Sequence, residues 1–181
     1  MRSYNDLRAS AKYAKQIFKN TPITVAEIGV HEGSNAEVML DNLNIKVLYL
    51  IDPYELGIGY DKIQEDTYLE SPSVIKQTAH DKLKRYSNIV WIQKKSKEAS
   101  VDIGTNVDYV YIDGDHRYLT VREDIELYFP LIREGGILAG HDYHQPFLPD
   151  FFKGLTTAVD EFGLKYNYTI QSDNLDWWIV K

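Results

Sequence analysis

The sequence contains no cysteine, and this absence excludes several kinds of site at once. Disulfide frameworks, thiolate zinc sites and cysteine nucleophiles all require a thiol. No stretch approaches the roughly 20 apolar residues of a membrane-spanning helix, and the opening MRSYNDLRAS carries no apolar segment. We therefore expect a cytoplasmic protein that makes no use of a membrane.

Clusters of positive charge are also missing from the chain. Its 27 acidic residues outnumber 20 lysines and arginines, the net charge is -7, and the basic residues are scattered. Because nucleic acid is bound through basic patches, the composition disfavours it as a partner and favours small-molecule chemistry. A homodimer is left open. With 181 residues, 44% of them hydrophobic, we expect a single domain, residues 1–181, around one core.

Segments typical of strands and of helices alternate along the chain. Nearly continuous apolar runs predict strands at residues 24–30, 46–52, 88–93, 107–113 and 135–142. Apolar residues at helical spacing, with capping signals, predict helices at residues 7–18, 34–43, 72–86, 97–101, 121–129 and 150–163. Two final runs, residues 165–171 and 175–181, predict a β-hairpin. The fold class is therefore α/β, with a Rossmann-like, open, mostly parallel seven-stranded sheet, helices on both faces and a C-terminal β-hairpin.

Residues 53–72 stand apart because they show no clean periodicity. The segment is rich in glycine, tyrosine and acidic residues. Such excursions often cover a site, so we expect a lid or an insertion here.

The segment VAEIGVHEGSNAEVML, residues 25–40, predicts a strand, a glycine loop and a helix. A dinucleotide-binding loop needs three glycines so that its backbone can approach a pyrophosphate. With Gly29 as the middle glycine, Glu27 and Glu32 occupy the other two positions, and two carboxylates would repel a pyrophosphate. An acid there suits a ligand with a positive end, such as an amino group or a sulfonium, while Gly29 and Gly33 allow close approach.

Asp52 completes this prediction of the ligand. It follows Gly33 by 19 residues, close to the interval of about 20 at which an acid accepts hydrogen bonds from ribose hydroxyls. The sequence thus predicts a nucleoside with a cationic, unphosphorylated tail.

Polar residues also follow the other predicted strands, where open parallel sheets bind their ligands. They are Ser96 and Lys97, Asp113 to His116, and His141 to His144. Because these strand ends meet at one edge of the sheet, we expect a single site there.

Three of these stretches, in this order, resemble the class I S-adenosylmethionine-dependent methyltransferases. They are the loop from Glu27 to Gly33, DGDHRY at residues 113–118, and GGILAGHDY at residues 135–143. The last two are most similar to small-molecule O-methyltransferases. The resemblance runs from about residue 25 to residue 162, apart from residues 53–72.

This resemblance implies a role for each site residue. Those that would bind the cofactor S-adenosylmethionine are Glu27, Gly29 and Gly33 at its methionine part, Asp52 at its ribose, Ser96 and Lys97 at its adenine, and Asp113 and His116 between cofactor and acceptor.

The catalytic centre implied by the resemblance contains Asp113 and Asp142. Metal-dependent members place one Asp after the fourth strand and a pair of Asp-Asp or Asp-Asn after the fifth. His141 stands where the first acid of the pair would be. Hard oxygen ligands favour Mg²⁺, and an imidazole shifts the preference towards Mn²⁺, Fe²⁺ or Zn²⁺. The hypothesis is a divalent metal, Mg²⁺ or Mn²⁺, on Asp113, His141 and Asp142. The metal-free alternative makes His144, His141 or His116 the general base.

Methyl transfer to a small-molecule hydroxyl, of a sugar or a glycosylated metabolite, is the activity that the resemblance implies. Two alternatives stay open at this point. A metallohydrolase could use Asp113, Asp115, His116, His141 and Asp142, although the glycine loop and Asp52 would then have no purpose. A catalytically inactive cofactor-binding module is the other.

Overall fold

The computed structural model describes residues 6–55, 71–146 and 149–181. The candidate lid at residues 53–72 lies mostly outside these ranges, so its role stays a prediction. None of the described helices is both long and apolar enough to cross a bilayer.

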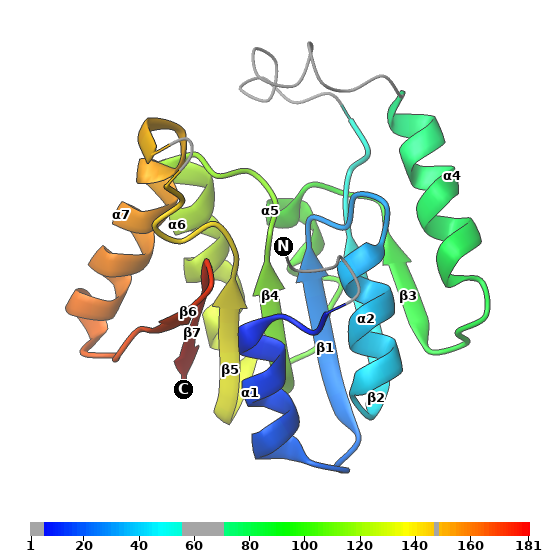
Figure 1. The fold of residues 1–181 in the computed structure, drawn as a ribbon, viewed down its shortest axis with the longest axis horizontal. Helices are drawn as coiled ribbons and strands as arrows, with labels where there is room; N and C mark the ends of the chain where they lie inside the picture. The colour runs from blue at the N-terminus through cyan, green and yellow to red at the C-terminus, as the bar shows by residue number, and fades with distance from the viewer. Residues whose placement is uncertain (1–5, 56–70, 147–148) are drawn as a thin grey trace.

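A seven-stranded sheet forms the centre of the molecule (Figure 1). Its strands are β1 (Ile23–Ile28), β2 (Ile45–Ile51), β3 (Ile89–Ile92), β4 (Val107–Ile112), β5 (Ile132–Gly140), β6 (Gln171–Asp173) and β7 (Asp176–Val180). Their order is β3-β2-β1-β4-β5-β7-β6. Strands β1 to β5 pair in parallel, and β7 is antiparallel to both of its neighbours. The predicted fold class is confirmed, including the C-terminal hairpin.

Helices cover both faces of this sheet (Figure 1). They are α1 (Ala9–Phe18), α2 (Ser34–Asn42), α4 (Pro72–Leu83), α5 (Ser96–Ala99), α6 (Tyr118–Tyr128) and α7 (Pro149–Tyr166), with a short 3₁₀ turn η1 (Phe129–Leu131) after α6. The side chains of β1 alternate between the two core layers, since Val25 packs with α1 and α2 while Ala26 and Ile28 pack with α6 and α7. This alternation is the period of two expected for a strand that is buried on both faces.

The strand order reverses between β1 and β4. From β1 the chain proceeds to β2 and β3 on one side, and β4 and β5 lie on the other. The carboxyl ends of these parallel strands point to the top of Figure 1. A ligand site is therefore expected above the ends of β1 and β4.

The predicted boundaries were wrong near the C-terminus. Helix α7 does not end at Gly163 but continues to Tyr166, and β6 covers only Gln171–Asp173 instead of residues 165–171. Gly163 is a packing position, because a Cβ there would lie 2.9 Å from the Cδ1 atom of Ile170. A glycine that admits a neighbouring side chain has the same sequence signature as one that ends a helix.

The start of one strand and the cap of one helix also differ from the prediction. Strand β5 begins at Ile132, so the adjacent Gly135 and Gly136 lie within the strand, where Gly135 has φ +71°. Helix α2 has Gly33 as its N-cap in the left-handed conformation, and Ser34 makes no capping hydrogen bond. The hydroxyl of Ser34 instead accepts a hydrogen bond from Lys82 Nζ at 2.6 Å.

Candidate active site

The glycine loop after β1 lies directly against the end of β4. The backbone N–H of Asp113 donates to the carbonyl oxygen of Ile28 at 2.7 Å. Gly29 has φ +86°, and a Cβ on it would lie 2.2 Å from the Asp113 carbonyl oxygen. No other residue fits here, so the close approach of the two strand ends by itself requires Gly29.

Glu27 is buried at the end of β1, with 1% of its surface exposed. Its Oε1 atom accepts a hydrogen bond from Asn35 Nδ2 at 2.8 Å, whereas Oε2 is buried and has no hydrogen-bond partner among the described residues. Burial, with a smaller contribution from the nearby Asp113, raises the pKa of Glu27 to about 8. A buried acceptor oxygen that lacks a partner is costly, and a cationic ligand group would stabilise it. This geometry fits the amino group of S-adenosylmethionine.

The raised pKa of Glu27 makes stability depend on pH. Its ordinary pKa is 4.5 and its folded pKa is about 8, so between these values the folded chain retains a proton that the unfolded chain releases. The free energy of unfolding of the ligand-free protein should therefore fall as pH rises through this window, by up to about 1.4 kcal/mol per pH unit. Glu27→Gln should remove this contribution. Chemical denaturation of both proteins across the window measures it, and a difference between them that is constant with pH would contradict the assignment.

Asp52 lies at the end of β2 and organises the glycine loop. Its Oδ2 atom accepts hydrogen bonds from the backbone N–H groups of Val30 and His31 at 2.9 and 3.0 Å. Its Oδ1 atom accepts one from the N–H of Tyr54 at 2.8 Å. A carboxylate has about four lone-pair sites, so Asp52 can still accept from a ribose hydroxyl while it holds the loop. The structure thus gives Asp52 a second role that its spacing alone did not indicate.

Asp113, His141 and Asp142 come together at the ends of β4 and β5. One ligand atom from each residue lies within 4.8 Å of the others. The Nδ1 atom of His141 is 3.1 Å from Asp142 Oδ1. These three side chains are the ones that the sequence predicted as metal ligands, and the fold does bring them together.

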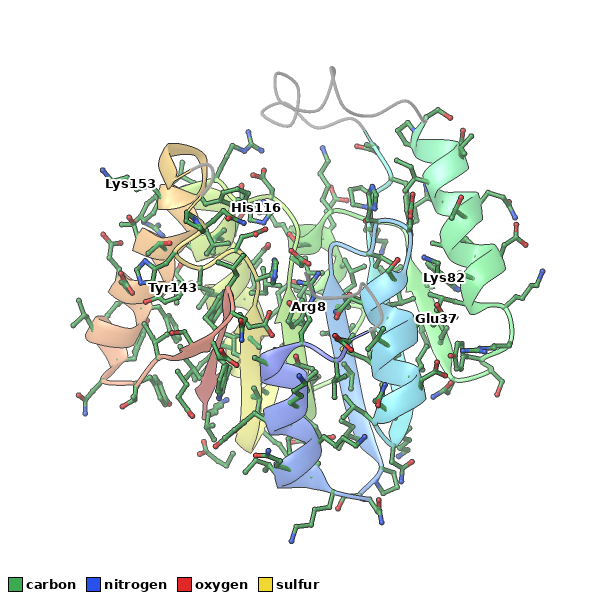
Figure 2. All side chains as sticks on the ribbon, in the orientation of Figure 1. Arg8, Glu37, Lys82, His116, Tyr143 and Lys153 are labelled. Carbon is green, nitrogen blue, oxygen red and sulfur yellow. The ribbon has the colours of Figure 1, made fainter. Side chains whose placement is uncertain are left out.

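His116 lies beside this group, in the loop between β4 and α6 (Figure 2). Its Nε2 atom is 3.1 Å from Asp142 Oδ2 and 3.9 Å from Asp113 Oδ1. Burial alone would raise the pKa of Asp142, but hydrogen bonds from His116 and His141 outweigh it and hold this pKa well below its usual range. Asp142 also has φ +59°, a rare conformation for a residue other than glycine. Backbone strain of this kind is often found at functional sites.

The roles of the other predicted site residues stay predictions, and the structure gives the contacts of most of them. Lys97 Nζ forms an ion pair with Glu123 on α6, with a distance of 2.6 Å to Glu123 Oε1. Asp115 accepts hydrogen bonds from the backbone N–H and the side chain of Arg117. It does not belong to the candidate metal-binding group of Asp113, His141 and Asp142. The side chain of His144 is exposed. Ser96 begins α5, and its carbonyl oxygen accepts a hydrogen bond from the Tyr128 hydroxyl.

Two residues at this edge were missed by the sequence analysis. Asn35, on the first turn of α2, holds Glu27, and its place just after the glycine loop was a usable signal. Arg8 contacts Asp113 Oδ2 at 3.0 Å from a position 105 residues away in sequence. No spacing rule connects residues so distant.

A family model described as a methyltransferase domain matches residues 26–143, which is more than half of the chain. The chain belongs to this family. The matched range begins in β1, contains the glycine loop and ends just after Asp142, so it spans the site described above. The prediction of a class I S-adenosylmethionine-dependent methyltransferase is thereby confirmed, whereas the subtype suggested by the DGDH and GHDY stretches stays a prediction.

One curated relative of this methyltransferase is an uncharacterized protein of Acanthamoeba polyphaga mimivirus. The two are 28% identical over 131 residues, which are 70% of this chain and 54% of that protein. The chain therefore spans about half the length of the curated relative that it matches.

Solved structures of methyltransferases share the fold. A Staphylococcus aureus protein assigned as a caffeoyl-CoA O-methyltransferase has a TM-score of 0.70 at 15% identity, over 96% of this chain and 84% of that one. The O-methyltransferase NovP has a TM-score of 0.67 at 15% identity, over 95% and 79%. MycE from the mycinamycin biosynthetic pathway, in complex with Mg and SAH, has a TM-score of 0.65 at 15% identity, over 95% and 48%.

Proposed function

We propose that this methyltransferase transfers the methyl group of S-adenosylmethionine to a hydroxyl oxygen of a small molecule, with a sugar or a glycosylated metabolite as the preferred acceptor. The observation that carries the proposal is the position of the Asp113, His141 and Asp142 group beside the unpaired oxygen of Glu27. A cation-binding acid and a cluster that can activate a hydroxyl then lie at one edge of the sheet.

A divalent metal such as Mg²⁺ or Mn²⁺ fits the residues present. Asp113 Oδ1 receives no hydrogen bond from the described residues, and two carboxylates with one imidazole form a donor set suited to such ions. We propose Asp113, His141 and Asp142 as the ligands. When bound, the metal would lower the pKa of the acceptor hydroxyl as a Lewis acid. The similar fold of MycE was solved with Mg and SAH, which is consistent with this proposal.

The residues of the chain supply orientation and proton transfer. The acceptor oxygen forms a bond to the methyl carbon while the carbon–sulfur bond breaks, and the sulfur leaves as a neutral thioether that needs no acid. Glu27 binds the amino group and Asp52 the ribose, so that the methyl group is held in line, which lowers the barrier by restricting motion. His116 is best placed to accept the hydroxyl proton, since Asp142 at 3.1 Å would stabilise the resulting imidazolium.

Two measurements on the purified chain test this proposal. Calorimetry should detect binding of S-adenosylhomocysteine, and a labelled-methyl assay with sugar and aromatic hydroxyl acceptors should detect transfer that chelation suppresses and Mg²⁺ or Mn²⁺ restores. No binding of S-adenosylhomocysteine would contradict the function and favour a metallohydrolase. Binding without transfer to any acceptor would favour a non-catalytic module.

Replacing Asp52 with alanine should weaken binding of S-adenosylhomocysteine by about 1–3 kcal/mol. The change removes the acceptor for the ribose and leaves the loop N–H groups of Val30 and His31 without their partner. Calorimetry measures the effect, with Asp41→Ala as the matched control because Asp41 is an exposed acid that pairs with Arg85. An unchanged dissociation constant would remove Asp52 from the site.

A further inference from the structure

We propose that Arg8 binds the carboxylate group of the methyl donor, beside Glu27, which binds the amino group of the same amino-acid end. The inference rests on the proposed function. It assigns a ligand contact to the residue just before α1, outside the range that the family model matches.

Arg8 is fixed above β4 by two contacts through one nitrogen. Its Nη1 atom donates to the Tyr111 hydroxyl at 2.6 Å and to Asp113 Oδ2 at 3.0 Å. The guanidinium also lies 5.4 Å from the centre of the Tyr111 ring. Figure 2 shows Arg8 near the middle of the molecule, at the beginning of α1.

The C-terminal hairpin sets this position. The Tyr111 hydroxyl donates to Asp176 Oδ1 at 2.9 Å, and Asp176 Oδ2 accepts hydrogen bonds from the backbone N–H and hydroxyl of Ser10 at 2.9 and 2.7 Å. Asp176 therefore supplies an acceptor to the N-terminus of α1, where free N–H groups and the helix dipole favour a carboxylate. Because Ser10 is anchored in this way, Arg8 is held close to Asp113.

The remaining donors of Arg8 are available to a ligand. A guanidinium has five N–H donors in a planar fork that matches a carboxylate. Only Nη1 is engaged by the described residues, and 28% of the side-chain surface is exposed. The remaining Nε and Nη2 atoms can therefore bind a further anion.

The charges at this edge complement a zwitterion. Glu27 presents an acceptor oxygen that no described residue pairs with, and Arg8 is close enough to lower the pKa of Glu27. The methionine end of S-adenosylmethionine carries one ammonium and one carboxylate on the same carbon atom. A neighbouring acid and guanidinium match that pair, whereas Arg8 alone would repel the ammonium.

A purely structural role for Arg8 makes a different prediction from ligand binding. If Arg8 only neutralised Asp113 and Asp176, its loss would weaken all ligands of the site to a similar degree. If it binds the carboxylate, its loss should weaken only ligands that have one. The test therefore compares S-adenosylhomocysteine with 5′-methylthioadenosine, which keeps the nucleoside and sulfur and lacks the amino acid.

Calorimetry with the Arg8→Ala variant should show about tenfold or greater loss of affinity for S-adenosylhomocysteine, the usual effect of losing one charge-assisted hydrogen bond. The affinity for 5′-methylthioadenosine should stay within about twofold of wild type. Arg8→Lys keeps the charge and lacks the planar fork, so it serves as a second variant if Arg8→Ala is too unstable to purify, and it should also lose more affinity for S-adenosylhomocysteine than for 5′-methylthioadenosine. Arg133→Ala is the matched control, since Arg133 also pairs with an acid, Asp108, at 2.6 Å and lies over an aromatic ring, that of Phe18.

The possible results separate this inference from the proposed function. Equal losses for both ligands in the Arg8 variants, or no loss for either, would overturn the role of Arg8 and leave the methyltransferase function standing. Failure of wild type to bind S-adenosylhomocysteine at all would overturn both.

Discussion

Replacing Asp142 with alanine should reduce the rate of methyl transfer by about a hundredfold or more and leave the affinity for S-adenosylhomocysteine nearly unchanged. Asp142 contacts both His141 and His116 at 3.1 Å, so its loss removes a proposed metal ligand and the partner of the proposed base together. Its carboxylate has no contact with the glycine loop or with Asp52 among the described residues.

Single-turnover assays and calorimetry measure these two quantities separately. The matched control is Asp173→Ala, because Asp173 is an exposed acid in the edge strand β6, which β7 separates from β5. Full activity in Asp142→Ala would discard the proposed catalytic centre. A large loss of cofactor affinity would instead place Asp142 in the cofactor site.

Replacing Gly29 with alanine should destabilise the fold by at least about 4 kcal/mol, a loss seen only for severe structural conflicts. The new Cβ would lie 2.2 Å from the Asp113 carbonyl oxygen and 2.7 Å from the Gly114 Cα atom. Both are backbone atoms, so the ends of β1 and β4 would have to separate. The φ of +86° adds about 1–2 kcal/mol for a residue with a side chain.

Thermal unfolding should show this as a melting temperature about 10 °C lower, or as insoluble protein. Gly104→Ala is the matched control, because a Cβ at Gly104 meets nothing within 4 Å and its φ is not positive. The control should melt close to wild type. Wild-type stability in Gly29→Ala would contradict the close approach of the backbone at the ends of β1 and β4.

The sequence was informative about the site wherever neighbouring residues carry the signal. Glu27, Gly29 and Gly33 belong to one loop, and the structure shows why the glycines are needed and that one buried oxygen of Glu27 has no hydrogen-bond partner among the described residues. Asp113, His141 and Asp142 follow their strands directly, and parallel strands end at one edge, so their meeting could be predicted.

Local patterns were less reliable where one residue type serves several purposes. Gly163 was interpreted as a helix end, but it makes room for Ile170 within α7. Lys97 pairs with Glu123 on α6, and its place at the adenine stays a prediction. For Gly163, the packing of the segment that follows α7 decided the outcome.

The sequence by itself determined the strand and helix alternation, the parallel sheet and the acidic glycine loop, because hydrophobic periodicity and local turn chemistry act over a few residues. Only the tertiary structure decided that Asp176 would anchor the start of α1 through Ser10 and that Arg8 would thereby reach Asp113. Hydrogen bonds and charge pairs between groups 100 or more residues apart depend on how the helices and strands pack. No local pattern in the chain encodes that packing.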